Sequence, residues 1–452
     1  MPDNTKRDLV LTLDIGSSSL RTNLFSITGE RLASAEAQSP YPVTTTIDGG
    51  VEIDPGELFD VVCAAIDRTL SLAGDSVNHI RGVGFCSLVS NVLGVDEQHE
   101  PTTPVYTWAD TRSAGAAEQI LALVDPHEVL ERTGCPVHSS YLPARLLWLK
   151  STLPERFEQT ACWVSLGDWI YRKLFGRSVQ SLSVASWGGL LNRHTLTCDE
   201  PLLDLLGIGT SNLPTLGDAS LGGSGLLRPY AERWPALRDV PWFPCIGDGA
   251  AGNLGSGCYS ERSVAIQVGT SAAVRALIPG PVPSIPEGLW CYRLDAETSL
   301  LGGALSEGGN WFGWLRDSLG IMLTPDLEQD AEALEPDAHG LTILPHIAGE
   351  RSPGWNGSAR GAITGLSLAT NKAHIVRGVQ EAVAMRLGLV FERLEGALPG
   401  VDKIVASGGA LLTSTGWLRI VADVIGRPIT ASMEEEASSK GAAMMAFRSL
   451  GL

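Results

Sequence analysis

Hydrophobic and polar positions follow strand and helix patterns in turn along the first part of the chain. A continuous apolar run at residues 9–13 is typical of a buried strand, and the alternation over residues 21–38 predicts a meander with a turn at residues 28–30. Between residues 54 and 73 apolar side chains repeat at helical spacing, after an aspartate that can cap the helix and a proline in its first turn. With a further apolar run at residues 80–86, the order β-β-α-β indicates a mixed sheet covered by helices.

The second half of the chain repeats this plan. Residues 263–277 predict a strand, a loop and a second strand, and residues 373–398 predict a long amphipathic helix. Residues 403–412 predict a strand with a glycine turn that leads into a helix over residues 414–426. A last predicted helix at residues 438–450 consists mostly of small residues, which allow close packing against a neighbour.

Two similar stretches, "LTLDIGSSSLR" and "VAIQVGTSAAV", mark the two halves. Each is a strand followed by a glycine and a loop that bears hydroxyl groups, and they align when Gly16 is paired with Gly269. The aspartate of the first copy, Asp14, is replaced by Gln267 in the second. We therefore expect a duplicated domain whose two copies close on a phosphate chain. Any metal ion is expected to be bound by the first copy alone.

Length, composition and charge narrow the class of protein. A chain of 452 residues exceeds one hydrophobic core, so two domains are expected, and we place them at residues 1–247 and 248–452. The hydrophobic fraction of 44% and the charged fraction of 19% are typical of a globular protein. The formal net charge of −18 argues against a nucleic-acid or anionic-membrane partner.

Cysteine usage and the chain start point to the cytoplasm. The eight cysteines are scattered without metal-binding spacing, and we interpret them as reduced core thiols. The polar start "MPDNTKRD" leads directly into a strand, so no signal peptide is expected, and no apolar run reaches the roughly 20 residues of a membrane span.

The stretch "DIGSSS" has the chemistry of a phosphate loop. A glycine after a strand lets the backbone approach an anion, and the hydroxyls of Ser17 and Ser18 can hold phosphate oxygens. Asp14 at the strand end can hold Mg²⁺ through water, and Arg21 can add positive charge. The alternative is an ordinary Asp-Gly-Ser hairpin turn, since short glycine-rich matches are weak evidence.

A second carboxylate, Asp248, lies between glycines in "CIGDGAAGNLGSG". The small residues that follow predict the start of a helix, where a carboxylate is stabilised as an anion. Such a carboxylate can accept a proton from a substrate hydroxyl that attacks a γ-phosphate. The alternative is a helix cap with no other role.

Three further stretches carry candidate binding residues. The sequence "YTWADTRS" places Trp108, Asp110 and Arg112 close together, as in a site where an aromatic ring packs on carbon and charged groups bind hydroxyls or a carboxylate. A structural salt bridge between Asp110 and Arg112 is the alternative. The Gly-Gly turns in "LSEGGNWFGWL" and "VASGGALLTS" permit close backbone approach to a ligand, although either one alone is also explained as a tight turn.

Taken together, these motifs resemble the FGGY carbohydrate kinase family of the actin/hexokinase/Hsp70 ATPase superfamily. The resemblance covers nearly the whole chain and rests on ordered motifs, among them "DIGSSSLR", "WADTRS", "GDGAAGNLGSG", "QVGTSAAVR", "GERSPGW" and "EASSKGAAMMA". It implies an α/β fold with two actin-like ATPase (ribonuclease H-like) domains and a ligand cleft between them. It also implies phosphorylation of a small sugar, polyol or sugar acid, with ATP and Mg²⁺ as cofactors.

The resemblance assigns roles to residues that match the family motifs. Asp248 matches the catalytic base, and Asp14 and Asp248 are the expected metal residues. The expected nucleotide-binding residues are Asp14, Gly16, Ser17, Ser18, Arg21, Gly269, Thr270, Gly309, Gly409, Ala410 and Thr413. The expected substrate-binding residues are Ser90, Asn91, Trp108, Asp110, Arg112 and Asp248.

Within the family, "TWADTRS" and "GERSPGW" are most similar to gluconokinases, which makes gluconate the preferred substrate. Xylulose, ribulose, glycerol and erythritol are the alternatives, because the arginine of W-x-D-x-R also occurs in relatives with neutral substrates. The chain departs from its relatives at Ser90, where xylulose and gluconate kinases commonly carry histidine, and at Ser181, where the family usually has aspartate. Trp187 is close to the second departure.

Two non-enzymatic functions compete with the kinase. A nucleotide-switching binding protein would need ATP but no small acceptor, and Asp248 with the W-x-D-x-R motif argues against it. An inactive regulator, suggested by Ser90 and Ser181, is opposed by the intact Asp14 and Asp248. A homodimer is the assembly considered, and the sequence does not determine the oligomeric state.

Overall fold

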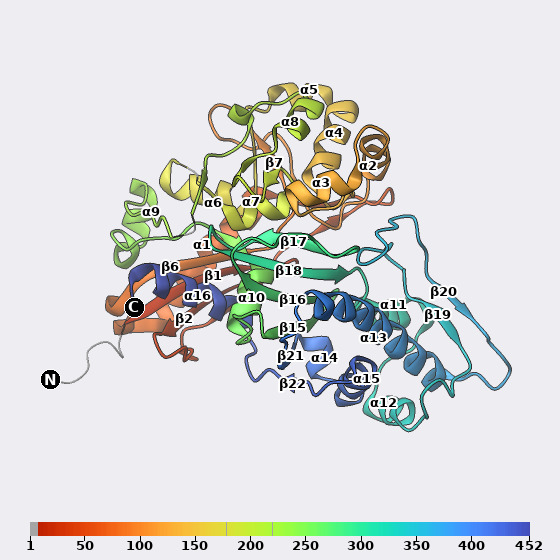
Figure 1. Cartoon of the computed structure of the whole chain (residues 1–452). Helices are drawn as coiled ribbons and strands as arrows, with labels where there is room; N and C mark the ends of the chain where they lie inside the picture. Colours follow the sequence, from red (N-terminus) through yellow and green to blue (C-terminus); the bar gives the residue numbers. More distant parts are fainter. Residues whose placement is uncertain (1–7, 178, 219) are drawn as a thin grey trace. The chain divides into compact units, whose positions relative to one another are not determined.

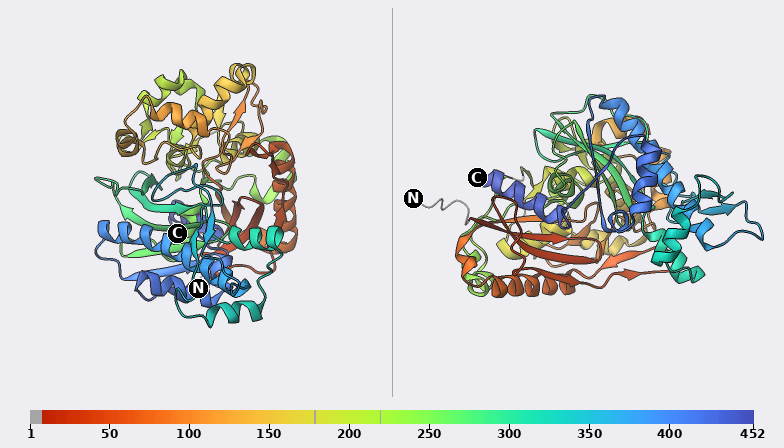
Figure 2. Two further views of the ribbon diagram at one scale, coloured as in Figure 1. Left: turned by 90° about the vertical axis from the view of Figure 1, so that its right-hand side faces the viewer. Right: turned by 90° about the horizontal axis from the view of Figure 1, so that it is seen from below.

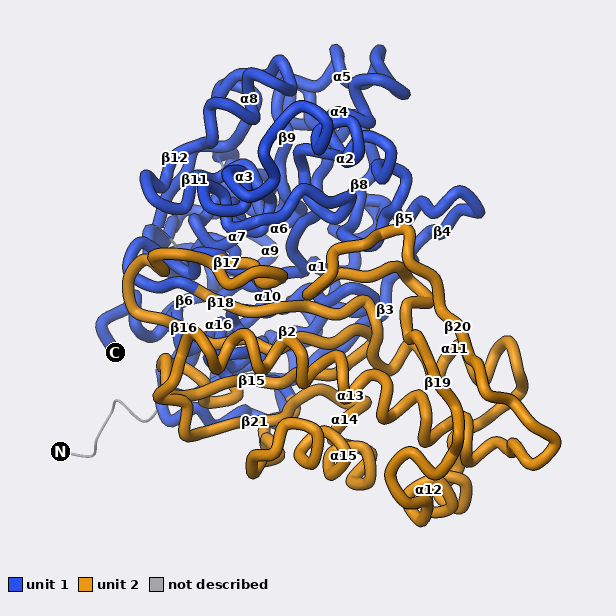
Figure 3. The backbone as a smooth tube through the Cα atoms, turned by 45° about the vertical axis from the view of Figure 1, so that its right-hand side comes forward, with its two compact units in different colours: residues 1–255, 292–299, 436–452 blue, residues 256–291, 300–435 orange. Residues whose placement is uncertain are grey.

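The computed structural model in Figure 1 describes residues 8–177, 179–218 and 220–452. The chain divides into two compact units, which Figure 3 distinguishes by colour. Unit 1 contains the residues up to 255, together with residues 292–299 and 436–452. Unit 2 contains residues 256–291 and 300–435.

These units differ from the predicted division at residue 247. Helix α10 (Asp248–Gly255), the segment 292–299 and helix α16 (Ala437–Leu450) belong to unit 1. The physical reason is packing, because α16 lies against α10 and against the strands of the unit 1 sheet. A helix at the C-terminal end of the sequence therefore completes the N-terminal unit.

Unit 1 is built on a five-stranded mixed sheet in the order β14-β6-β1-β2-β3. Its strands are β1 (Leu9–Ile15), β2 (Ser19–Ser26), β3 (Ala37–Pro40), β6 (Ile80–Ser87) and β14 (Ile246–Gly247). The pairs β1–β2 and β2–β3 are antiparallel, whereas β6 runs parallel to both β1 and β14. Helix α1 (Pro55–Ala73) covers one face of this sheet and α16 covers the other (Figure 2, right).

The alternation of side chains along β1 decides which residues meet which helix. Leu11, Leu13 and Ile15 belong to the large apolar core that also contains residues of α1. Val10 instead packs with Phe447 and other residues of α16. Asp14 is four positions after Val10 in the strand, so its side chain lies on the same face of the sheet as that of Val10, the face covered by α16.

Close packing of α10 on α16 depends on two glycines. A Cβ atom on Gly255 would overlap the Ala437 carbonyl oxygen, and a Cβ atom on Gly441 would overlap the Ala251 carbonyl oxygen. The two helix backbones therefore approach closely enough that only hydrogen fits at these positions. This confirms the expectation that the small-residue helix at the C-terminal end packs closely.

The middle of unit 1 is rich in helices and has an apolar cluster of its own, which includes Val92, Tyr106, Leu146, Trp163 and Leu202. Its helices are α2 (Ala114–Leu121), α3 (Pro126–Thr133), α4 (Leu142–Thr152), α5 (Pro154–Gln159), α6 (Leu166–Phe175), α7 (Leu182–Gly188), α8 (Glu200–Leu206) and α9 (Arg228–Arg233). This region also contains short paired strands. They include β5 (Val51–Ile53) with β8 (Val105–Tyr106), β7 (Leu93–Val95) with β9 (Cys162–Val164), and β10 (Gln180–Ser181) with β13 (Leu216–Gly217).

Unit 2 repeats the strand plan of unit 1, which confirms the predicted duplication. Its sheet has the order β17-β18-β16-β15-β21-β22. The strands are β15 (Ser263–Val268), β16 (Ala272–Pro279), β17 (Trp290–Arg293), β18 (Thr298–Leu305), β21 (Lys403–Ser407) and β22 (Thr430–Ala431). Like β1, β15 pairs antiparallel with the strand that follows it and parallel with a strand on its other side.

The helices of unit 2 include the two predicted at residues 373–398 and 414–426 and three for which no prediction was made. They are α11 (Asn310–Leu319), α12 (Pro325–Glu332), α13 (Lys372–Ala397), α14 (Gly409–Leu412) and α15 (Thr415–Ile425), and a hairpin of β19 (Thr342–Leu344) and β20 (Ala362–Thr364) lies between α12 and α13 in sequence. All eight cysteines are free, and seven are buried. Within the part of the chain that the structure describes, no helix combines the length and apolarity that crossing a membrane requires.

Candidate active site

Two carboxylates lie at the ends of neighbouring strands in unit 1. Asp14 is at the end of β1, opposite Cys86 of β6. On the other side of β6, Ile246 of β14 is also opposite Cys86, and Asp248 follows this strand directly as the first residue of α10. Because the carboxyl ends of parallel strands meet at one edge of a sheet, the structure brings the two predicted metal residues to the same edge.

The first turn of α16 bonds to both of these aspartates, to the side chain of Asp14 and to the backbone of Asp248. The Ser439 hydroxyl donates to Asp14 Oδ2 at 3.1 Å, and the Ser438 hydroxyl donates to the Asp248 carbonyl oxygen at 3.2 Å. The Asn23 amide of β2 donates to Ser439 Oγ at 3.3 Å. Sequence reasoning quoted these serines within "EASSKGAAMMA" but gave them no role, because their partners are more than 150 positions away in sequence.

Asp14 and Asp248 place two acidic side chains at this sheet edge. Burial raises the pKa of Asp14, whereas hydrogen bonds from Cys86 and Ser439 and the charge of Arg21 act in the opposite direction. Burial and the charges of Asp248 and Asp14 also raise the pKa of Tyr41. Two hard oxygen ligands in a negative field suit Mg²⁺, which typically takes one or two carboxylates and completes its shell with water and phosphate oxygens.

The loop after β1 has the geometry of the predicted first phosphate loop. The Gly16 amide donates to the Ser19 carbonyl oxygen at 3.0 Å, which closes a tight turn that leaves Ser17 and Ser18 exposed. The Tyr41 hydroxyl donates to the Gly16 carbonyl oxygen and so fixes the position of the loop. The loop thus exposes the hydroxyl groups of Ser17 and Ser18 close in sequence to the buried carboxylate of Asp14.

Arg21 lies directly opposite Asp14 in the β1–β2 ladder. Its guanidinium is paired with Glu436 at 3.2 Å, at the N-terminal end of α16. Burial raises the pKa of Glu436 to about 7, against the opposing charge of Arg21. Sequence reasoning did not identify Glu436, whose partner comes from the other end of the chain.

In unit 2, the structure brings together three of the predicted nucleotide-binding segments. The Gly309 amide donates to the Gly269 carbonyl oxygen at 2.7 Å, and a Cβ atom on Gly309 would lie 2.8 Å from that oxygen and 2.9 Å from the Ala410 Cβ. Thr270, Gly409 and Thr413 are exposed beside this contact. A glycine is required at position 309, because a side chain there would collide with both neighbouring loops, whereas a Cβ atom on Gly269 or Gly409 would meet no atom within 4 Å.

The strand position that holds Asp14 in unit 1 has a different chemistry in unit 2. Gln267 accepts a hydrogen bond from the Arg275 guanidinium of β16. An amide oxygen already bonded to arginine is a poor ligand for a cation. The duplicated strand therefore carries a carboxylate at this position in unit 1 only, and the binding of a metal ion by Asp14 stays a prediction.

The W-x-D-x-R residues form the ion pair that the sequence analysis gave as the alternative. Arg112 Nη2 lies 2.5 Å from Asp110 Oδ2 and 2.6 Å from Glu52 Oε1, and its guanidinium lies 4.8 Å from the centre of the Trp148 ring. Asp110 is buried and also accepts hydrogen bonds from the Val51 and Arg112 amides. Arg112 therefore already has two carboxylate partners, and Trp108 packs as a partly buried residue on the large core.

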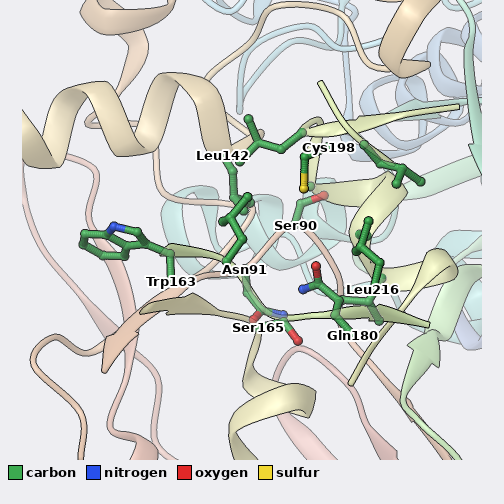
Figure 4. A pocket seen from close by; sticks show the side chains of 14 residues that line it. Ser90, Asn91, Leu142, Trp163, Ser165, Gln180, Cys198 and Leu216 are labelled. Atoms are coloured by element: carbon green, nitrogen blue, oxygen red, sulfur yellow. The ribbon is translucent and has the colours of Figure 1, made fainter. Parts of the chain in front are cut away.

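Ser90 and Asn91 line a pocket within unit 1 (Figure 4), together with Ser165, Gln180 and apolar residues of the helical region. Trp108, Asp110, Arg112 and Asp248 are not among the residues that line it. The Ser90 hydroxyl donates to the Trp187 carbonyl oxygen at 2.7 Å. Asn91 donates to the Leu88 carbonyl oxygen at 2.6 Å and accepts from the Leu166 amide at 2.8 Å, so both polar residues hold the loop after β6 in place.

A buried carboxylate behind this pocket predicts a pH effect on stability. Burial raises the pKa of Asp168 from 3.8 to about 6, although Ser165 and Gln180 donate hydrogen bonds to it. The folded state therefore holds this proton more tightly than the unfolded chain, and the stabilisation, complete below pH about 4, is lost as the pH rises through about 6.

Replacing this carboxylate with a neutral amide, Asp168→Asn, should remove that dependence. We expect the wild-type free energy of unfolding to fall by about 1 kcal/mol, relative to the variant, between about pH 5 and pH 7.5. Urea unfolding of both proteins at the two pH values measures this difference. A difference that stays constant with pH would show that Asp168 titrates normally.

These features define a phosphotransferase of the actin-like ATPase class. Two aspartates lie at strand ends on one sheet edge, each duplicated half has a loop with hydroxyl groups, and glycine loops converge in unit 2. The N-terminal domain of the FGGY family of carbohydrate kinases matches residues 9–255, and the C-terminal domain of the same family matches residues 264–450. The chain therefore belongs to the FGGY family of carbohydrate kinases and has its two-domain actin-like fold.

Several members of this family are similar to the chain over nearly its whole length. A gluconokinase from Bacillus subtilis (strain 168) is 29% identical, over 98% of this chain and 88% of that protein. A glycerol kinase from Citrifermentans bemidjiense is 28% identical, over 97% of this chain and 90% of that protein. Among solved structures, a gluconate kinase from Lactobacillus acidophilus is 26% identical with a TM-score of 0.87, covering 98% of this chain and 89% of that one. A ligand-bound xylulose kinase from the same organism also has 26% identity and a TM-score of 0.87, covering 98% and 90%.

Proposed function

We propose that this carbohydrate kinase transfers the γ-phosphoryl group of ATP to a hydroxyl of a sugar acid, with gluconate preferred and 6-phosphogluconate and ADP as products. The observation that carries the reaction is Asp248, a half-buried carboxylate at the first position of α10, next to the buried Asp14. The preference for gluconate is supported by similarity to gluconokinases over nearly the whole chain. Eight free cysteines support a reducing compartment, and we place the enzyme in the cytoplasm.

In this proposal Asp248 is the general base. Its Oδ1 accepts a hydrogen bond from the Gly249 amide at 2.7 Å, which orients the carboxylate that takes the proton of the attacking hydroxyl. Phosphoryl transfer depends mostly on positioning and charge stabilisation, so an oriented carboxylate is sufficient as the proton acceptor.

The nucleotide would be held by both phosphate loops. Gly16, Ser17, Ser18 and Arg21 would bind phosphate oxygens from unit 1, and the converging loops of unit 2 would do so with Gly269, Thr270 and Gly309, while Gly409, Ala410 and Thr413 bind the adenosine part. Asp14 and Asp248 would hold Mg²⁺. When bound, this ion neutralises the negative charge that builds up on the phosphate oxygens during transfer.

A neutral sugar or polyol is the second candidate substrate, and one observation favours it. Arg112 already binds the carboxylates of Asp110 and Glu52, so a gluconate carboxylate would be its third acidic partner. Hydroxyl recognition by the predicted substrate residues Asp110, Ser90 and Asn91 would suit a neutral substrate equally well. Similarity to glycerol and xylulose kinases supports the same alternative.

A panel of acceptors with Mg-ATP separates the two candidates. We expect gluconate to give the highest kcat/KM among gluconate, xylulose, ribulose, glycerol and erythritol, measured as ADP release in a coupled assay. Highest kcat/KM on a neutral acceptor would leave the kinase activity in place and overturn the gluconate preference. No ADP release with any acceptor, from protein that binds ATP, would contradict the proposed reaction itself.

A further inference from the structure

Helix α7 (Leu182–Gly188) lies beside the short strand that leads into Asp248. The strand β14 is at the edge of the unit 1 sheet, with β6 on one side only. Backbone groups alternate in direction along a strand, so Ile246 faces β6 while Cys245 and Gly247 direct their backbone groups away from the sheet. These outward groups are buried, and each must find a partner that is not a strand.

Two serine hydroxyls provide those partners. Ser181 Oγ donates to the Cys245 carbonyl oxygen, and the Gly247 amide donates to Ser183 Oγ at 3.1 Å. Both serines are completely buried. Ser181 is at the same time the N-cap of α7, because its Oγ accepts from the Val184 amide at 3.1 Å.

The end of the same helix also limits the position of Gly247. A Cβ atom at Gly247 would lie 2.8 Å from Val89 Cγ1 and 2.9 Å from Trp187 Nε1. The residue before Asp248 is therefore held at its backbone amide and packed on its Cα side. A shift of this peptide would move the carboxylate of Asp248 directly.

We propose that Ser181 and Ser183 are positioning residues for Asp248, because their hydroxyls replace the missing neighbour strand of β14. This inference rests on the proposed role of Asp248 as the base. It also gives a reason for the departure of the chain from its family at position 181. An ionised aspartate there could still cap α7, but it has no proton to donate to the Cys245 carbonyl oxygen.

The test compares serines within one helix. Ser183→Ala removes the acceptor for the Gly247 amide, and Ser183→Thr keeps it. The matched control is Ser186→Ala, because Ser186 is also completely buried and its hydroxyl bonds to the backbone of Arg293 and of Ser183, whereas the Gly247 amide donates to the Ser183 hydroxyl. We expect Ser183→Ala to lower kcat by roughly 10- to 100-fold with both KM values within about threefold, as small displacements of reacting groups do. Ser186→Ala and Ser183→Thr should keep kcat within about threefold of wild type.

Loss of packing alone would affect both alanine variants alike. Equal kcat for Ser183→Ala and Ser186→Ala, at equal midpoint temperatures of unfolding, would overturn the inference. If Ser183→Ala does not fold, Ser183→Cys provides the same comparison with a weaker acceptor of similar size. Ser181→Asp should lower kcat at neutral pH and recover part of it at lower pH, where the carboxyl gains a proton, and an unchanged kcat at both pH values would contradict the role of Ser181.

The Asp248→Asn variant distinguishes a failure of the proposed function from a failure of the positioning role. If Asp248→Asn keeps normal turnover, the base is assigned wrongly whatever the serine variants do. If Asp248→Asn is inactive and Ser183→Ala keeps the wild-type kcat, only the positioning role is overturned.

Discussion

Asp248→Asn abolishes sugar phosphorylation and leaves nucleotide binding largely intact, if Asp248 is the general base. An asparagine keeps the size of the side chain and an oxygen that can accept from the Gly249 amide, now 2.7 Å from Asp248 Oδ1. It cannot take a proton from the attacking hydroxyl. General-base catalysis typically contributes about 10²- to 10⁴-fold, and we expect kcat to fall by about that factor.

Coupled measurement of ADP release gives kcat, and calorimetric titration with a non-hydrolysable ATP analogue gives the affinity for nucleotide. The matched control is Asp317→Asn, because Asp317 is exposed and pairs with its neighbour Arg316. Near-normal turnover by Asp248→Asn would show that another group takes the proton. Loss of nucleotide affinity together with turnover would instead assign Asp248 to binding.

Gly441→Ala is expected to be among the most destabilising single methyl additions in this chain. The new Cβ atom would overlap the Ala251 carbonyl oxygen, and neither backbone can rotate away as a side chain could. The helices α10 and α16 would have to separate, which exposes part of the core around Ala443, Ala446 and Phe447. Overpacking of this kind costs roughly 1–3 kcal/mol where the surroundings give way, and we expect about 4 kcal/mol or more between two backbones.

The same substitution should lower activity, because α10 begins with Asp248 and the first turn of α16 holds Asp14 through Ser439. Urea unfolding monitored by tryptophan fluorescence measures the loss of stability. The control is Gly115→Ala in α2, where a Cβ atom meets no atom within 4 Å. There we expect a stabilisation of up to about 1 kcal/mol, since alanine restricts the unfolded chain and favours the helix. Equal effects of the two substitutions would show that α10 and α16 are less closely packed than described.

Local sequence pattern was sufficient for the elements with a clear period or a clear helix cap. The apolar run at residues 9–13, the helix after Asp54 and the strand at residues 80–86 all form as predicted, at β1, α1 and β6. These elements are specified by short-range signals, which are side-chain periodicity, a capping aspartate and a proline in the first turn. The duplicated strand and loop could also be recognised, because both copies keep the glycine and the hydroxyl residue.

The partners of the site residues could not be predicted in the same way. The sequence placed Asp110 and Arg112 close together, but Glu52, the second partner of Arg112, comes from a distant strand pair. Ser181 was noted only as a departure from the family, and its bond to the Cys245 carbonyl oxygen depends on where β14 ends. Such contacts follow from the folding of remote segments onto one another, which local propensity does not encode.

The sequence by itself determined that this protein is a duplicated α/β kinase with an acidic residue at one of its two repeated strand ends and two hydroxyl-bearing loops. Those features depend on residue identity at fixed spacing, so they can be read without knowing the fold. Only the tertiary structure decided that the last helix, α16, completes the first unit and that its serines bond to the Asp14 carboxylate and to the backbone of Asp248. The reason is physical: burying the small-residue face of α16 requires α10 and the strands β1 and β6, and Asp14 lies near the end of β1 while Asp248 is the first residue of α10.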